Sequence, residues 1–127
     1  MSTITEDYVS FETAKLLKEK GFYSEDCFAF YKENGEIGFL QTFGDITDYD
    51  SETCVIAPTL QMAMKWLRKM HDVFISITYE KWDVVFIADV KSPVSGIDCW
   101  VDNKHNCWFK YEEAAEEAIK FCLERII

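Results

Sequence analysis

Glycine and proline are scarce in this chain, whose 127 residues include five glycines, which form no glycine-rich loop, and two prolines. The P-loop, the G-x-G-x-x-G fingerprint, the G-x-S-x-G elbow and the H-E-x-x-H helix are all absent from the sequence. Each of these motifs works because it sets a phosphate cradle, a nucleophile or a pair of metal ligands at a fixed spacing. Without them, we expect a protein that is not an enzyme and that binds no cofactor and no metal.

Basic residues are also in short supply. Lysine and arginine number 13 against 23 acidic residues, which gives a formal net charge of −10. Such a charge repels DNA, RNA and anionic membranes, and the sequence has no basic block that would override it. No apolar run is long enough to cross a bilayer. We therefore expect neither nucleic acid nor membrane as a partner, whereas a basic protein would be attracted.

The cysteines favour a reducing compartment. Five cysteines, an odd number, are spread over the chain, and the opening residues Met-Ser-Thr-Ile-Thr-Glu-Asp do not resemble a signal peptide. Small secreted domains usually pair their cysteines, whereas cytosolic proteins keep their thiols reduced. We expect a cytoplasmic protein whose thiols are unpaired and mostly buried.

Three segments show the apolar spacing of amphipathic helices, in a chain whose 49% apolar residues suffice for one domain over residues 1–127. Residues 8–20 have an N-cap candidate in Ser10 and a stop signal in Gly21. Residues 57–70 and 111–124 are the other two. The middle helix has an unusually wide apolar face, whose residues are Leu60, Met62, Ala63, Met64, Trp66, Leu67 and Met70.

Between the first two helices, the pattern predicts a hairpin and a loop. Residues 27–32 and 37–43 flank Asn34-Gly35, a pair that favours positive φ at both turn positions and therefore a tight β-hairpin. The acidic segment 44–56 is predicted to be a surface loop.

After the middle helix, residues 73–79 and 82–90 alternate like two strands around a turn at Glu80-Lys81. In the second of these, Trp82 and Val84 are expected to share an apolar strand face with three later residues, Phe86, Ala88 and Val90. Residues 97–101 and 106–109 are predicted to form another short hairpin.

The element order is α-β-β-α-β-β-(β-β)-α, which predicts an α+β fold. Hairpins with helices collected on one side form a two-layer sandwich, here an antiparallel sheet of four to six strands with three helices.

Two clusters match metal-binding motifs only in part. The acidic loop Asp45–Glu52 suggests calcium, but in an EF-hand frame starting at Asp48 the positions that require glycine and glutamate are both threonine. Cys99, His105 and Cys107 suggest zinc, but a closed site takes four ligands and usually a short Cys-x₂₋₄-Cys pair, which is absent. A solvated loop and core-facing strand cysteines are the simpler interpretations.

Cys107 and His105 also carry the one enzymatic alternative. Residues at i and i+2 of a strand share a face, so the imidazole could deprotonate the thiol. However, the sequence identifies neither an oxyanion-binding group nor a third residue that would orient the histidine. A small Cys/His-dependent enzyme is therefore kept only as an alternative.

Four tryptophans, Trp66, Trp82, Trp100 and Trp108, are expected to be mostly core residues. Trp66, on the flank of the middle helix, and Trp100 are the two expected to reach the surface. Because tryptophan is enriched at binding hot spots, Trp66, Met62 and Trp100 are predicted to be an interaction surface.

Three helical blocks carry a resemblance to a known family: Ala57–Arg68, Val9–Phe22 and Tyr111–Ala118. Together they resemble small uncharacterised proteins of gut Bacteroides and of their phages and mobile elements. That family has no assigned activity, so the resemblance transfers no functional residue. It implies a small cytoplasmic accessory protein, with a phage as one source.

We therefore predict a non-enzymatic accessory or protein-interaction domain. Its partner would be another protein or a second copy of the chain, which could bind through a sheet edge or through the flank of the middle helix and form a homodimer. The main alternative is an acidic nucleic-acid mimic that blocks a host DNA- or RNA-binding protein. This alternative requires carboxylates that line one face like phosphates.

Overall fold

Three helices and six strands make up the part of the chain that the computed structural model describes, which is residues 7–23, 29–39, 53–101 and 107–127. In chain order they are α1 (Phe11–Glu19), β1 (Ala29–Tyr31), β2 (Ile37–Phe39), β3 (Val55–Ile56), α2 (Leu60–His71), β4 (Phe74–Glu80), β5 (Val85–Ser92), β6 (Ile97–Trp100) and α3 (Tyr111–Arg125). Helices and antiparallel strands occur in separate runs along one chain, so the predicted α+β class is confirmed.

The strands form two antiparallel sheets of three strands each, where the sequence predicts one sheet of four to six. The chain divides into two compact units, Met1–Thr59 with the order β2-β1-β3 and Leu60–Ile127 with the order β4-β5-β6. β3 lies inside the segment that is predicted to be loop, because Ile56 pairs with Phe30 of β1. A single domain over the whole chain stays a prediction.

α1 is bounded by the caps that its sequence predicts. The Ser10 hydroxyl accepts a hydrogen bond from a backbone N–H in the first turn at 3.2 Å. At the other end Gly21 has a φ of 90°, a left-handed value that costs glycine little. The Gly21 N–H donates to the Lys18 carbonyl and the Phe22 N–H donates to the Leu17 carbonyl. This pair of hydrogen bonds is a Schellman motif, so the helix ends at the predicted glycine.

The hairpin of β1 and β2 forms at the predicted place, but with a different turn. Among its turn residues only Gly35 has positive φ, at 90°. The Asn34 side-chain oxygen accepts a hydrogen bond from the Glu36 N–H at 3.0 Å, and Asn34 itself stays out of the left-handed region. The Gly35 N–H donates to the Lys32 carbonyl, and the Lys32 N–H donates to the Glu36 carbonyl. The loop is therefore a type I turn followed by a glycine bulge.

α2 buries most of the predicted stripe, namely Leu60, Ala63, Met64 and Leu67. Met70 is 66% exposed, so its assignment to the stripe is wrong. The reason is the end of the helix: the chain turns at Asp72, which has a φ of 53°. Beyond the turn, the buried Val73 donates its N–H to the Leu67 carbonyl. Val73, and not Met70, thus continues the buried surface of α2.

β4 and β5 pair without a bulge, and Glu80 opposite Val85 is their last pair. The turn therefore spans residues 81–84, and β5 begins at Val85 instead of at residue 82. The prediction that Trp82 and Val84 belong to an apolar strand face is wrong, because both lie in this turn and are exposed.

The hairpin expected between residues 97–101 and 106–109 is not formed in the described residues. β6 pairs with β5 instead, and Trp108 forms an antiparallel bridge with Phe86 further along β5. Between these two contacts Val101 donates its N–H to the Ala88 carbonyl. Both segments therefore follow the same strand, one after the other.

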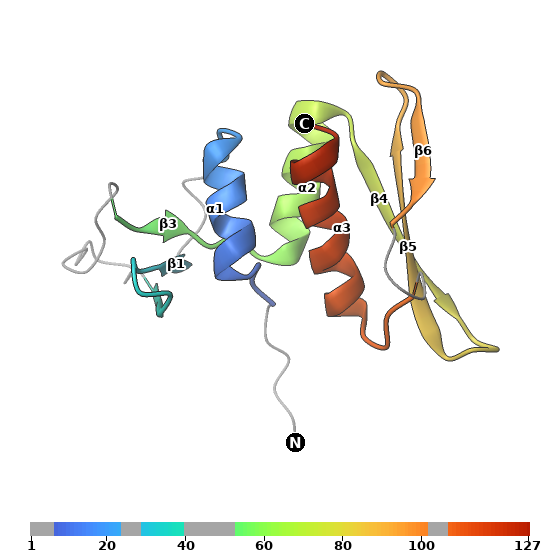
Figure 1. The fold of residues 1–127 in the computed structure, drawn as a ribbon, viewed down its shortest axis with the longest axis horizontal. Coiled ribbons are helices and arrows are strands. Elements are labelled where there is room, and N and C mark those ends of the chain that lie inside the picture. The colour runs from blue at the N-terminus through green and yellow to red at the C-terminus, as the bar shows by residue number, and fades with distance from the viewer. Residues whose placement is uncertain (1–6, 24–28, 40–52, 102–106) are drawn as a thin grey trace. The chain divides into compact units, whose positions relative to one another are not determined.

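The second unit has two layers. α3 packs against α2, β4 and β5, and α2 also contacts β4, so that both helices lie on one side of the sheet (Figure 1). The buried residues of α3 are Ala114, Ala115, Ala118, Ile119, Cys122 and Leu123. Within the described residues, no helix is long and apolar enough to span a membrane.

Candidate interaction surface

The two faces of the β4-β5-β6 sheet carry different side chains. Directly opposed residues point to the same face and alternate residues point to opposite faces, so the register assigns every residue. The inner face, toward the helices, consists of Ile75, Ile77, Tyr79, Phe86, Ala88, Val90, Ser92, Ile97 and Cys99. The outer face consists of Phe74, Ser76, Thr78, Glu80, Val85, Ile87, Asp89, Lys91, Asp98 and Trp100. Complete burial of Ala88 and Val90 identifies the side that the helices cover.

Two aromatic side chains are exposed on the outer face. Phe74 on β4 is 43% exposed and Trp100 on β6 is 62% exposed. Asp89 lies opposite Trp100, while Lys91 lies opposite both Phe74 and Asp98. The outer face therefore combines apolar rings with charged groups, which is the composition of a protein-binding surface more than that of a core.

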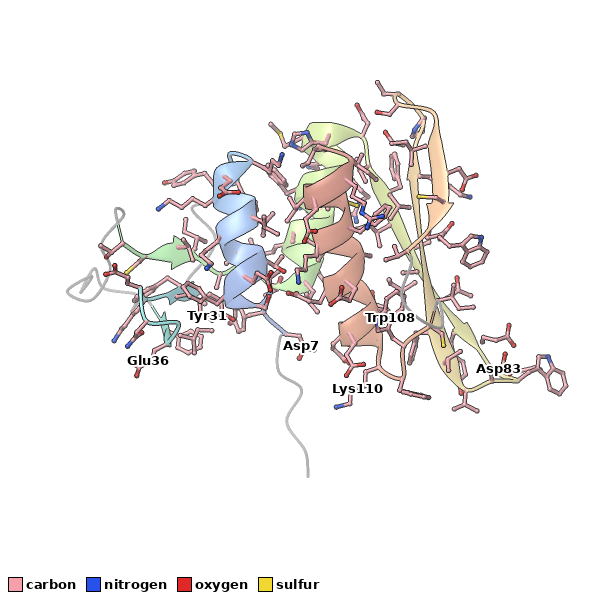
Figure 2. All side chains as sticks on the ribbon, in the orientation of Figure 1. Asp7, Tyr31, Glu36, Asp83, Trp108 and Lys110 are labelled. Carbon is pink, nitrogen blue, oxygen red and sulfur yellow. The ribbon has the colours of Figure 1, made fainter. Side chains whose placement is uncertain are left out.

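The turn between β4 and β5, here called the hairpin tip (residues 81–84), exposes two further apolar side chains, Trp82 and Val84. Trp82 is 83% exposed. Its backbone N–H donates to a Glu80 carboxylate oxygen at 3.1 Å, and the Lys81 ammonium lies 5.3 Å from the centre of its ring. Asp83 marks the tip in Figure 2, where the hairpin projects away from α3. The hairpin tip thus presents a tryptophan to solvent.

Val84 in the same turn is held in a strained conformation. Its φ of 56° lies in the left-handed region, which a β-branched residue rarely adopts. That conformation costs a non-glycine residue about 1–2 kcal/mol. The side chain is 61% exposed, so burial does not offset much of this cost. Strain of this kind concentrates at functional positions, and here it occurs beside the most exposed tryptophan.

An aromatic row supports the hairpin from the inner face. The ring centres of Tyr79 and Phe86 are 5.2 Å apart, and those of Phe86 and Tyr111 are 6.1 Å apart. The Tyr111 hydroxyl accepts a hydrogen bond from the Gln61 amide at 3.1 Å. The Phe86 backbone also exchanges two hydrogen bonds with Trp108, of 2.7 and 2.9 Å. These contacts join the hairpin to α2 and α3, so the exposed groups sit on a well-anchored support.

The three residues predicted to be an interaction surface lie in different layers. Met62 and Trp66 are half-buried on α2, where the rings of Trp66 and His71 are 4.7 Å apart. Trp100 lies on the outer face of the sheet, on the side away from the helices. The structure therefore separates Trp100 from the other two and places it on the same face as Phe74.

Sequence reasoning missed Phe74, Trp82 and Val84 as exposed apolar residues. Of the four tryptophans, Trp108 is buried and Trp100 is exposed, both as expected, whereas Trp82, which was expected in the core, is exposed. A signal for Phe74 was present, because it alternates in phase with two polar residues of the same strand. The signal for Trp82 was its position between Lys81 and Asp83, which favours a turn.

None of the four described cysteines is in a disulfide. Burial, and after it the neighbouring Cys99, raises the pKa of Cys122 to about 12. This thiol is therefore protonated at neutral pH and is a poor nucleophile. Cys107 is half-buried, and His105 lies outside the described residues, so their proposed pairing stays a prediction.

No group of three or more histidine, cysteine, aspartate and glutamate side chains in the described ranges is placed to hold a metal ion. That finding does not test the two metal hypotheses. The acidic segment 45–52 lies outside the described residues, and so does His105 of the Cys99–His105–Cys107 cluster.

Comparison with known proteins does not assign this chain to a family. No protein-family model, curated protein or solved structure matches this chain. The resemblance to the Bacteroides family therefore stays a prediction.

Proposed function

We propose that this protein is a non-enzymatic protein-interaction domain that binds its partner through the outer face and the hairpin tip. One observation carries the proposal: Phe74, Trp82 and Trp100 are exposed on the outer face and the hairpin tip, whereas Ala88, Val90 and Ser92 on the inner face are buried. Phenylalanine and tryptophan are enriched in protein interfaces, and tryptophan in particular at their energetic centres. Six of the ten outer-face residues are polar, as is usual for the solvent face of an antiparallel sheet, and the exposed rings of Phe74 and Trp100 depart from that pattern.

The charges of the outer face describe the partner. The outer face carries three carboxylates and one ammonium beside its two exposed rings: Glu80, Asp89, Lys91 and Asp98. The whole chain has a formal net charge of −10, which raises the association rate with a basic protein and repels an acidic one. The surface therefore fits a partner with an apolar patch that is rimmed by lysine or arginine.

The anchoring of the hairpin supports the same function. Binding costs conformational entropy whenever loops and side chains have to be ordered. The aromatic row from Tyr79 to Tyr111 and the paired strands hold the outer face in place before any partner arrives. A preorganised surface of this kind avoids most of that cost.

Affinity capture with the tagged full chain tests the proposal, followed by titration of each captured protein in purified form. The test variant is Phe74→Ala/Trp100→Ala, and the control is Tyr23→Ala, which removes an exposed aromatic side chain from the first unit. Loss of one hot-spot residue costs about 2 kcal/mol, which is about 30-fold in the dissociation constant, so loss of two should weaken binding by about several hundred-fold. The control should bind like the wild type. A partner that binds the test variant as tightly as the wild type would refute the outer face as the contact surface.

The acidic mimic receives no specific support. In the second unit, exposed carboxylates lie both on α3, at Glu112, Glu113, Glu117 and Glu124, and on the outer face of the sheet, at Asp98. A mimic needs carboxylates that line one face, whereas these lie on both layers. The accessory role in a phage-related setting and the Cys/His-dependent enzyme likewise stay predictions.

A further inference from the structure

β4 forms a long sheet edge without the usual protection. In the described residues it pairs with β5 alone, so its other side has no strand beside it. Its seven residues are Phe-Ile-Ser-Ile-Thr-Tyr-Glu, without proline or lysine, and its register with β5 contains no bulge. Natural proteins usually guard an exposed edge with one of these devices, because a free row of N–H and C=O groups pairs readily with another strand.

The other sheet edges in the described residues are guarded by their length. β2 has three residues, β3 has two and β6 has four, against seven for β4. Short edge strands are a recognised way of discouraging edge pairing. Among the described edges, β4 therefore stands out as the one able to accept a further strand over several residues.

The hydrogen bonds of β5 show which groups of β4 face the open side. Phe86 exchanges both of its backbone hydrogen bonds with Trp108, so neither points toward β4. In an antiparallel pair, residues that exchange hydrogen bonds alternate with residues that do not. Tyr79, the partner of Phe86, therefore directs its N–H and C=O away from β5. By the same alternation, Ile75 and Ile77 do so as well.

We propose that β4 pairs with β4 of a second copy of this chain, antiparallel and about a two-fold axis at Ile77. Ile77 is the middle residue of the strand, so this register uses its whole length. Ile77 then exchanges hydrogen bonds with Ile77 of the other copy, and Ile75 with Tyr79. Every outward backbone group of these three residues finds a partner, and the two sheets join into one.

The side chains suit this register. On the inner face, Ile75 meets Tyr79 and Ile77 meets its own copy, which covers apolar groups that are only partly buried in the single chain. On the outer face, Ser76 lies opposite Thr78, a pair that forms hydrogen bonds across strands. Glu80, the one charged residue of β4, falls opposite Phe74. No two like charges therefore meet along the edge, and the strand is complementary to itself.

Net charge sets the salt dependence of the dimer. Two chains that each carry a formal net charge of −10 repel one another, and dissolved salt screens this repulsion. Because the edge itself contributes no ion pair, added salt should tighten the association. An interface built on ion pairs would respond in the opposite direction.

Sedimentation equilibrium of the reduced full chain tests the dimer, with Ser76→Lys/Thr78→Lys as the edge variant. Both residues are exposed on the outer face, so lysine is tolerated in the monomer, while in the dimer the new lysines oppose one another. The control, Val94→Lys/Ser95→Lys, adds the same charge in the exposed turn after β5. We expect a salt-strengthened dimer for wild type and control, and a dissociation constant at least about tenfold higher for the edge variant. A wild-type monomer, or equal dissociation constants for all three, would overturn the proposal.

Cross-linking tests the register. Ser76→Cys and Thr78→Cys are made separately, mixed and oxidised, because residue 76 of one copy should lie opposite residue 78 of the other, within the Cα separation that a disulfide needs. Residues 70–81 form one tryptic peptide that contains no native cysteine, so mass spectrometry identifies the link. The mixture should form this link, and neither variant alone should. Equal linking in the unmixed samples, or no link in the mixture, would overturn the two-fold axis at Ile77. Neither experiment depends on the partner of the outer face.

Discussion

The inner and outer faces of the β4-β5-β6 sheet come from the same strands, yet their apolar side chains have different surroundings. Ala88 and Val90 on the inner face are fully buried, whereas Phe74 and Trp100 on the outer face remain exposed. The strands alone do not distinguish the faces, since apolar residues occur on both. What distinguishes them is the helical layer of α2 and α3. One face of the sheet therefore stabilises the fold, and the other is available for contact with another molecule.

The largest effect on stability should come from the inner face. Val90→Ala removes two methyl groups from a fully buried site and leaves a cavity. We expect the free energy of unfolding to fall by about 2–3 kcal/mol, which combines the lost transfer energy with the cavity term. Urea denaturation followed by circular dichroism measures the change. A loss below about 1 kcal/mol would mean that the inner face is not closely packed.

The buried thiol behind the sheet should make stability fall at alkaline pH. The pKa of Cys122 is raised from 9.0 to about 12 in the folded chain, so between these values the unfolded thiol ionises while the folded one stays protonated. Stability from this group is complete below pH 9.0 and declines by about 1.4 kcal/mol per pH unit above it. Urea denaturation at about pH 8 and about pH 10.5 should show a shallower decline for Cys122→Ala than for the wild type. Parallel curves would contradict the assignment.

A smaller effect, of opposite sign, is expected at the hairpin tip. Val84→Gly relieves the left-handed strain but adds freedom to the unfolded chain, so we expect a net gain of about 0.5–1 kcal/mol. Val94→Gly is the control, since Val94 is exposed in a turn but does not have positive φ. Thermal unfolding should rank Val84→Gly above the wild type and the control at or below it. If both variants lose stability, the conformation of Val84 costs less than its φ indicates.

The smallest effect on stability should come from removing Trp100, although its side chain is much larger than that of Val90. Trp100→Ala removes an indole from the outer face, where it is mostly exposed, so we expect a change within about 0.5 kcal/mol. Val90→Ala, which removes far fewer atoms, should cost several times more. Denaturant titration of the two variants side by side provides the comparison. A Trp100→Ala loss above about 2 kcal/mol would show that the outer face belongs to the core.

The helices of this fold could be predicted well because their signals are local. Ser10 and Gly21 mark the ends of α1, and each acts through hydrogen bonds within a few residues. The buried alanines of α3 follow from its 3.6-residue period in the same way. The alternation of β4 was also correct, because the period of a strand does not depend on its neighbours.

The candidate site could be predicted only in part, because it depends on pairing and coverage. Trp100 was expected to reach the surface and does so, whereas its grouping with Trp66 and Met62 depended on which layer each occupies. Trp82 was misplaced because the pairing of Glu80 with Val85 decides where the strand begins. A shift of that pairing would have returned Trp82 to a strand face.

By itself, the sequence determined the α+β class, the ends of α1 and the acidic, aromatic-rich character of the chain. Caps, turns and hydrophobic periods act over a few residues, so they can be read along the chain. Only the tertiary structure decided that the strands divide into two sheets, that β4 is an edge, and that Phe74 and Trp100 lie exposed on the same face. These features depend on which distant segments pair and which face a helix covers, and such contacts leave no fixed spacing in the sequence.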